Sequence, residues 1–289
     1  MKFTAFDAAD LAAFEPTAKV GLLATVNPAG LPHISLITSI QAKSTTQLMW
    51  GQFTEGLSKQ HVRENPRTAF LILTMDRRLW RGKANYTHAV KEGDDYVIFN
   101  SKPMFRYNAY FGIHTVDYMD LVETGGRESL PLASIAGAAL LTRVGILGDA
   151  MRYRAPKTPR VPQNSPLTPW GESLFNRLAG LKFIAWIGAD GFPTITPLLQ
   201  GVAADRRRIV FSPLAYGDEL RAIPPGAPVA VFGMSMQMED ILVRGPFAGY
   251  RRIALTRLGA VDIDWVYNSM PPKMGQIYPP EPLTPVTDF

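Results

Sequence analysis

The chain has 289 residues, of which 46% are hydrophobic and 19% charged, and its formal net charge at pH 7 is +5. This balance is typical of a packed globular protein, and the lack of cysteine excludes disulfides, thiolate metal sites and cysteine nucleophiles. Basic residues are scattered along the sequence, and no apolar run approaches the roughly 20 residues that span a bilayer. We therefore expect a cytoplasmic protein that binds neither nucleic acid nor membrane.

In chain order, the first half of the sequence is mostly predicted strand. A short amphipathic helix over residues 7–14 precedes apolar runs, many of them β-branched and bounded by Gly, Pro, Asn or Asp. Residues 27–30 (NPAG) separate two such runs and predict a β-hairpin. A short helix is predicted over residues 57–66, where Pro66 ends it. Repeated strands with few helices predict a small antiparallel barrel with short helices.

The second half of the sequence repeats this pattern at an offset of 161 positions. A second short helix is predicted over residues 170–179, ahead of the second set of strands. The ungapped part of the match pairs residues 22–26 with 183–187, Gly30 with Gly191, Pro32 with Pro193 and residues 48–50 with 209–211. Small shifts extend it to residues 80–82 (WRG) and 243–245 (VRG). Such an ordered series indicates an internal duplication.

These features predict a mainly β protein of two domains, residues 1–150 and residues 151–289. The connection over residues 151–169 contains five prolines and is expected to be extended and exposed. The first copy also has an insertion, at residues 100–112, that is rich in aromatic side chains. This insertion is interpreted either as a lid over a ligand pocket or as a helix that packs onto the barrel end.

The start of the predicted helix over residues 57–66 has the composition of an anion-binding loop. Free N–H groups at a helix N-terminus, together with the helix dipole, favour an anion. Ser58 can cap the helix and donate its hydroxyl to a phosphate, while Lys59 and Arg63 supply positive charge. The alternative is an ordinary serine cap beside solvated basic side chains.

The second copy lacks these groups. At the offset of 161, Glu219 takes the place of Ser58 and Leu220 takes the place of Lys59. Because a carboxylate repels a phosphate, only the first copy is expected to hold this anion.

Three segments of the first copy resemble the pyridoxamine 5′-phosphate oxidase-like FMN-binding split barrels. They are LLATVNPAGLPHIS, LMWGQFTEGLSKQHVRENPRTAFLI and WRGKANY, in which a strand, a Ser-Lys helix start and an Asn-Pro-Arg turn follow in the family's order. The resemblance covers residues 7–123 and, more weakly, residues 170–267. It implies two tandem split β-barrels of the FMN-binding type, paired as an intramolecular pseudo-dimer or through a homodimer.

The resemblance also implies which residues bind the FMN. Thr38 and Ser39 correspond to a polar pair at the ribityl phosphate, and Ser58 and Lys59 correspond to the phosphate cradle. The contacts to the flavin ring correspond to Trp50, Gly51, Gln52, Arg81 and Lys83. Trp50 can instead belong to the core, and Thr38 and Ser39 can be ordinary polar residues at a strand end. No metal site and no catalytic side chain is predicted.

The resemblance favours an FMN-binding oxidoreductase that acts on a small-molecule redox substrate. Oxidation of vitamin B6 itself is disfavoured, because the sequence finishes PPEPLTPVTDF, without the arginine-containing motif of the oxidase proper. One alternative is a non-enzymatic module that binds flavin, a deazaflavin or haem, with His61 or His114 as the haem ligand. Another is a duplicated barrel without a cofactor.

Overall fold

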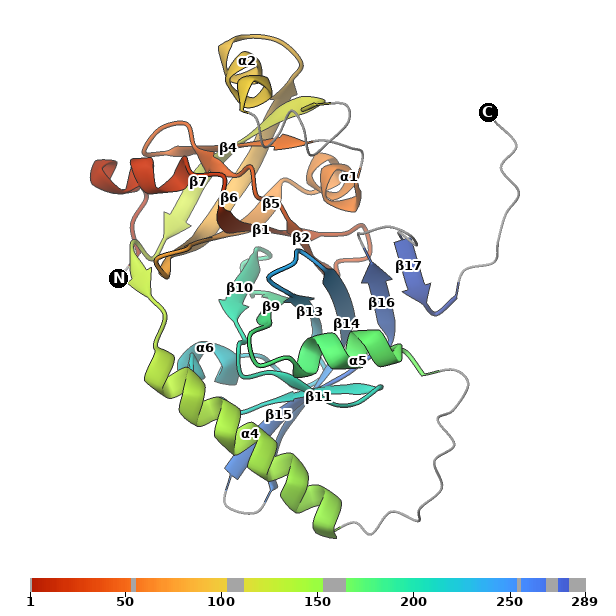
Figure 1. Cartoon of the computed structure of the whole chain (residues 1–289). Helices are drawn as coiled ribbons and strands as arrows, with labels where there is room; N and C mark the ends of the chain where they lie inside the picture. The colour runs from red at the N-terminus through yellow and green to blue at the C-terminus, as the bar shows by residue number, and fades with distance from the viewer. Residues whose placement is uncertain are drawn as a thin grey trace. The chain divides into compact units, whose positions relative to one another are not determined.

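A computed structural model describes residues 2–52, 56–102, 112–152, 165–253, 256–268 and 275–280. The chain folds into two compact units, Met1–Leu130 with Ala185–Ile195, and Pro131–Ile184 with Thr196–Phe289 (Figure 1). Most of the predicted insertion at residues 100–112 lies outside the described residues, as does most of the predicted connection at residues 151–169.

The first sheet is antiparallel, and its strands follow the order β2-β1-β5-β6-β7-β4-β3, with β8 paired to β6. The elements of this part of the chain are η1 (Ala8–Phe14), β1 (Lys19–Val26), β2 (Pro32–Leu36), β3 (Gln41–Ala42), β4 (Gln47–Gln52), α1 (Leu57–Glu64), β5 (Arg67–Thr74), β6 (Arg78–Val90), α2 (Asp94–Ser101), β7 (Thr115–Thr124) and β8 (Glu128–Ser129). The helix predicted over residues 7–14 is the 3-10 helix η1, and the one predicted over residues 57–66 is α1.

The second sheet follows the order β10-β9-β13-β14-β15-β12-β11, with β16 paired to β14 and β17 to β16. The elements of this part are α4 (Leu132–Arg152), α5 (Pro169–Asn176), β9 (Leu181–Ile187), β10 (Pro193–Pro197), β11 (Val202–Asp205), β12 (Arg208–Phe211), α6 (Gly217–Arg221), β13 (Pro228–Met234), β14 (Asp240–Ile253), β15 (Thr256–Asp262), β16 (Trp265–Asn268) and β17 (Gly275–Tyr278). The helix predicted over residues 170–179 is α5.

The two sheets repeat one topology, because each strand of the first has its counterpart at the same place in the second. The backbone hydrogen bonds repeat as well. Ile37 N donates to Gly21 O and Leu198 N donates to Lys182 O, both at 2.7 Å, and these two pairs are related by the offset seen in the sequence. The predicted fold class, mainly β with two tandem split barrels, is confirmed.

The interior of the first barrel is built around two tryptophans, Trp50 on β4 and Trp80 on β6, both fully buried. Phe14 of η1 packs edge-on against Trp80 at a ring-centroid distance of 5.0 Å. The indole N–H of Trp80 donates to Asp10 Oδ2 at 2.9 Å, so its one polar atom is satisfied within the core. η1 therefore closes one side of the barrel core through both apolar and polar contacts.

The long helix α4 is absent from the sequence-based prediction. It turns small residues such as Ala138 and Gly145 toward the second sheet, where Gly145 lies against Leu258, while large residues such as Leu140 (64% exposed) face outward. The usual rule that large apolar residues mark the buried face therefore does not locate this helix. Within the described part of the chain, no helix combines the length and apolar character needed to cross a bilayer. The domain boundary at residues 150 and 151 stays a prediction, because contacts alone do not show which part folds independently.

At one matched position in each barrel, a side chain would collide with the backbone of the neighbouring strand. A side chain at Gly82 of β6 would overlap the carbonyl oxygen of Glu123 on β7, and one at Gly245 of β14 would overlap the carbonyl oxygen of Asp262 on β15. These glycines are the matched Gly of the WRG and VRG segments, so the repeat in the sequence has a steric cause.

We predict that Gly82→Ala and Gly245→Ala each lower the free energy of unfolding by about 3 kcal/mol or more, because backbone must move to admit the methyl group. Gly56→Ala is the control, because the nearest atom to its added Cβ is the tip of Gln52 at 3.7 Å, and it should cost less than about 1 kcal/mol. Chemical denaturation would measure all three. Equal losses in the three variants would contradict the steric interpretation.

Candidate functional site

Among the described residues, no side chain caps the start of α1. Gly56 is the N-cap, with extended backbone angles of φ −142° and ψ 165°. The prediction that Ser58 caps the helix is therefore wrong, since Ser58 lies inside the first turn and its hydroxyl instead contacts the hydroxyl of Ser35 on β2. The first-turn amides thus form a helix N-terminus without a side-chain cap, which suits an anion.

Lys59 follows Ser58 and is buried, with an exposed fraction of 1%. Its Nζ lies 3.5 Å from Nδ1 of His114, and the backbone N–H of His114 donates to Gln52 O at 2.7 Å. Through these contacts Lys59 is fixed beside the end of β4. A buried ammonium group is stabilised by negative charge nearby, so this position favours an anionic ligand.

The acidic group behind Lys59 is Asp117 of β7, which is fully buried and lies opposite Trp50 in the β4–β7 ladder. Burial raises the pKa of Asp117, while the Thr115 hydroxyl, at 2.9 Å, and the charge of Lys59 act in the opposite direction. Burial, together with the charge of Asp117, raises the pKa of Tyr86 to about 12. Lys59 and Asp117 thus interact electrostatically beside the end of β4.

The predicted polar pair lies in the turn after β2, which ends at Leu36. The Ser39 hydroxyl is buried, donates to Gly51 O at 2.6 Å and accepts from Gly51 N at 3.1 Å. It therefore ties the turn to β4. Thr38 is half-buried in the same turn.

The three residues predicted at the end of β4 differ in what they present. Trp50 lies in the core, and its Nε1 has no hydrogen-bond partner among the described residues. A side chain at Gly51 would come within 2.7 Å of Ile113 and 3.1 Å of Phe99, so close packing requires glycine there. Gln52 is buried at the strand end, next to the start of α1.

Arg81 and Lys83, the two basic residues predicted on β6, are held by carboxylates. The Arg81 guanidinium makes a two-pronged contact with Glu128, with Nη2 to Oε2 at 3.0 Å and Nε to Oε1 at 3.1 Å. Lys83 Nζ lies 2.9 Å from Glu123 and, within the first unit, 2.6 Å from Asp190. Their charges are thus already paired with carboxylates of the protein.

The structure joins most of the predicted residues through contacts around the end of β4 and the start of α1. Ser39 is bonded to Gly51, and Lys59 reaches Gln52 through His114. Ser35 and His114 complete this group, and the sequence-based prediction misses their roles. The internal repeat could have indicated Ser35, because its counterpart Thr196 also has a hydroxyl group.

The two histidines considered as haem ligands both have protein partners. His61 Nδ1 lies 3.0 Å from the Thr25 hydroxyl, and its ring packs edge-on to His33 at 5.2 Å. His114 contacts Lys59 as described. His61 is buried, whereas His114 lies at an exposed position.

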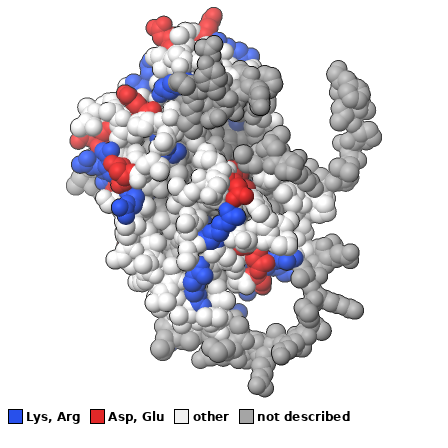
Figure 2. All heavy atoms as spheres, in the orientation of Figure 1, with Lys and Arg blue, Asp and Glu red and all other residues white. Residues whose placement is uncertain are grey.

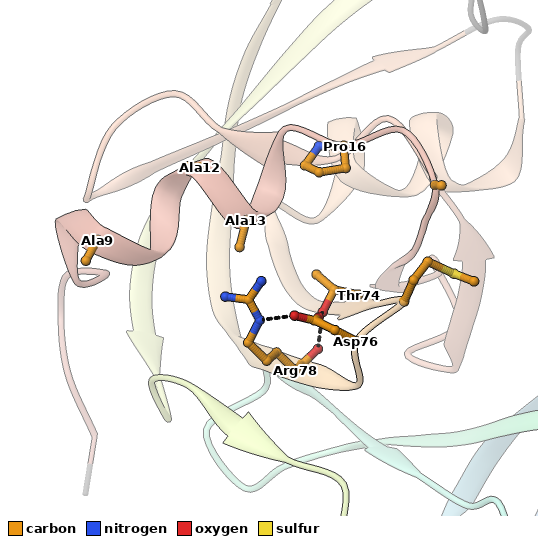
Figure 3. A pocket seen from close by; sticks show the side chains of 9 residues that line it. Ala9, Ala12, Ala13, Pro16, Thr74, Asp76 and Arg78 are labelled. Carbon is orange, nitrogen blue, oxygen red and sulfur yellow. Dashed lines mark hydrogen bonds and ion pairs between the residues drawn. The ribbon is translucent and has the colours of Figure 1, made fainter.

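A surface cavity of about 520 Å³ lies elsewhere in the first unit, beside η1 and the β5–β6 turn (Figure 3). Alanines of η1 line it together with Met75, and Asp76 and Arg78 form an ion pair of 2.7 Å in its wall. None of the predicted cofactor residues lines it. On the face shown in Figure 2, described acidic and basic side chains lie interspersed in small groups, as on an ordinary solvated surface.

We predict that Asp117→Asn stabilises the protein above neutral pH. Because burial raises the pKa of Asp117, the folded state binds this proton more tightly than the unfolded chain, and stability falls as pH rises through the raised pKa. Asparagine cannot ionise, so the variant should melt a few degrees above the parent at about pH 8, and the gain should fade at about pH 4.5.

Thermal melts at both pH values would test this, with Asp120→Asn, an exposed residue on the same strand, as the control. A gain in melting temperature that is the same at both pH values would contradict the assignment.

No protein-family model matches the chain, and no curated protein matches it. Solved structures do match. An FMN-binding protein from Syntrophomonas wolfei subsp. wolfei is 15% identical over 43% of this chain and 84% of its own, with a TM-score of 0.35. A Clostridium acetobutylicum protein related to general stress protein 26, of the pyridoxinephosphate oxidase family, is 9% identical over 43% and 91%, with a TM-score of 0.31. An F420 reductase is 18% identical over 37% and 90%, with a TM-score of 0.30.

Each of these matches spans less than half of this chain and most of the other chain. The chain is similar in fold to FMN-binding split-barrel proteins of the pyridoxamine 5′-phosphate oxidase type, and its own two sheets share one strand order.

Proposed function

We propose that this chain is a flavoprotein that binds FMN in its first barrel and acts as an oxidoreductase on a small-molecule redox substrate. The observation that carries the proposal is the start of α1, where an uncapped helix N-terminus meets the Ser35–Ser58 hydroxyl pair and the buried Lys59. The FMN, when bound, supplies the redox chemistry, and the protein supplies position and electrostatics.

The charges at this site suit a phosphate monoester. Such a phosphate carries nearly two negative charges at neutral pH and three acceptor oxygens. The first turn of α1 offers backbone amides, the Ser35–Ser58 pair offers a hydroxyl donor, and Lys59 provides an ammonium group. These groups are the complement of the charge and acceptor oxygens of a phosphate.

The remaining predicted residues fall into two roles in this proposal. Thr38 and the backbone of Gly51 and Gln52 line the approach to the phosphate cradle, with Ser39 positioning Gly51 through its paired hydrogen bonds. For Arg81 and Lys83, binding at the flavin ring would require them to share or exchange their carboxylate partners.

We predict that Ser58→Ala combined with Lys59→Met weakens FMN binding at least about 100-fold, because each lost charge-assisted contact is worth roughly 1.5–3 kcal/mol. Riboflavin, which lacks the phosphate, should bind the variant and the parent with similar affinity. Fluorescence titration with both flavins would therefore isolate the phosphate contribution.

Ser129→Ala combined with Lys91→Met, two exposed positions in the same half of the chain, is the matched control. Unchanged FMN affinity in the Ser58/Lys59 variant, or an equal loss for riboflavin, would remove α1 as the phosphate site.

We further predict that the purified protein carries, or takes up, one flavin per chain. An absorbance spectrum before and after heat release of the cofactor would measure the ratio, and oxidation of a reduced nicotinamide with dyes or oxygen would measure turnover. A bound flavin without turnover would favour a non-enzymatic module. A Soret band would favour haem, and a colourless protein that takes up no FMN would leave only the duplicated fold.

A further inference from the structure

The position of the Ser35–Ser58 hydroxyl pair recurs in the second barrel. There the offset of 161 pairs Ser35 with Thr196 and Ser58 with Glu219. The surrounding hydrogen bonds confirm that residues paired by this offset occupy equivalent places in the two barrels. Ser39 Oγ donates to Gly51 O at 2.6 Å, and its counterpart Gln200 Nε2 donates to Ser212 O, the counterpart carbonyl, at 3.1 Å.

At this position the second barrel holds a carboxylate. The Thr196 hydroxyl is fully buried and donates to Glu219 Oε2 at 2.6 Å. The next residue is Leu220, fully buried where the first barrel buries Lys59. The donor on the strand is thus retained, the hydroxyl on the helix is replaced by an acid, and the neighbouring cation is replaced by an apolar side chain.

We infer that Glu219 is the built-in anion of the second barrel, a carboxylate that occupies the place a ligand phosphate takes in the first. For the phosphate position in the first barrel, this inference rests on the proposed function. Glu219 accepts the hydrogen bond of the buried Thr196 hydroxyl, and its negative charge would repel a second anion at this place. One competent flavin site per chain follows.

The adjacent acid, Asp218, provides a matched control. Its side chain is fully exposed and pairs with Arg221 one turn further along α6 at 3.1 Å. Removing either carboxylate changes the charge of the chain equally, but only Glu219 serves the buried hydroxyl. A difference between the two variants therefore reports the buried contact and not net charge.

The test is chemical rescue in the full chain, without flavin. We expect Glu219→Ala to lower the melting temperature by about 2–6 °C, and about 50 mM sodium formate, whose carboxylate fits the vacated space, to restore at least half of this loss. Asp218→Ala should shift melting by less than about 1 °C and show no response to formate beyond that to equal sodium chloride.

Three results would overturn the inference: equal losses in the two variants, equal stabilisation by chloride and formate, or equal formate stabilisation of the parent protein. If Glu219→Ala does not fold, Thr196→Val, Glu219→Gln and their double variant replace it. Their losses must be non-additive if the two side chains act as one unit. Because no arm of the test contains flavin, failure of FMN binding in the first barrel would leave this outcome unaffected.

Discussion

The site depends on how one long strand is shared between two ladders. Residues 79–85 of β6 pair with β5 and residues 82–90 pair with β7. The second ladder begins at Gly82, where the backbone of β7 comes too close for any side chain. A register shift between Lys83 and Ala84 follows directly, so the sheet bends there. β7 pairs on its other side with β4, which precedes α1 in the chain. The place of the proposed phosphate site is thus set by the strand geometry.

The two barrels share this strand arrangement but differ in the charged groups near the start of the following helix. Both place a hydroxyl on the second strand, Ser35 or Thr196, against the following helix, and both tie the intervening turn to the next strand through a side chain. The first barrel adds a buried cation and an uncapped helix start, which together favour an external anion. The second barrel adds a carboxylate and an apolar residue, which disfavour binding of an external anion.

The sequence allowed prediction of what depends on local pattern. The hairpins, η1, α1, α5 and the repeat all follow from turn residues and short apolar runs. What depends on tertiary packing could not be predicted. Helix α4 could not be predicted because it buries the small residues Ala138 and Gly145 and exposes the larger Leu140. The prediction that Ser58 caps α1 is wrong because Gly56 is the N-cap and the Ser58 hydroxyl contacts Ser35. The burial of Lys59 and the hydrogen bonds between Ser39 and Gly51 likewise could not be predicted from the sequence.

Glu219 is the clearest example of a residue whose role could not be predicted from the sequence, because that role depends on its hydrogen-bond partner. In the sequence it is only an acid that would repel a phosphate, whereas in the structure it accepts a hydrogen bond from a fully buried hydroxyl. A buried hydroxyl that loses a hydrogen-bond acceptor costs free energy of about 1–3 kcal/mol. Replacing Thr196 by an apolar residue would remove that cost, and so does an internal carboxylate. The second barrel retains the donor, and Glu219 on its helix accepts from it.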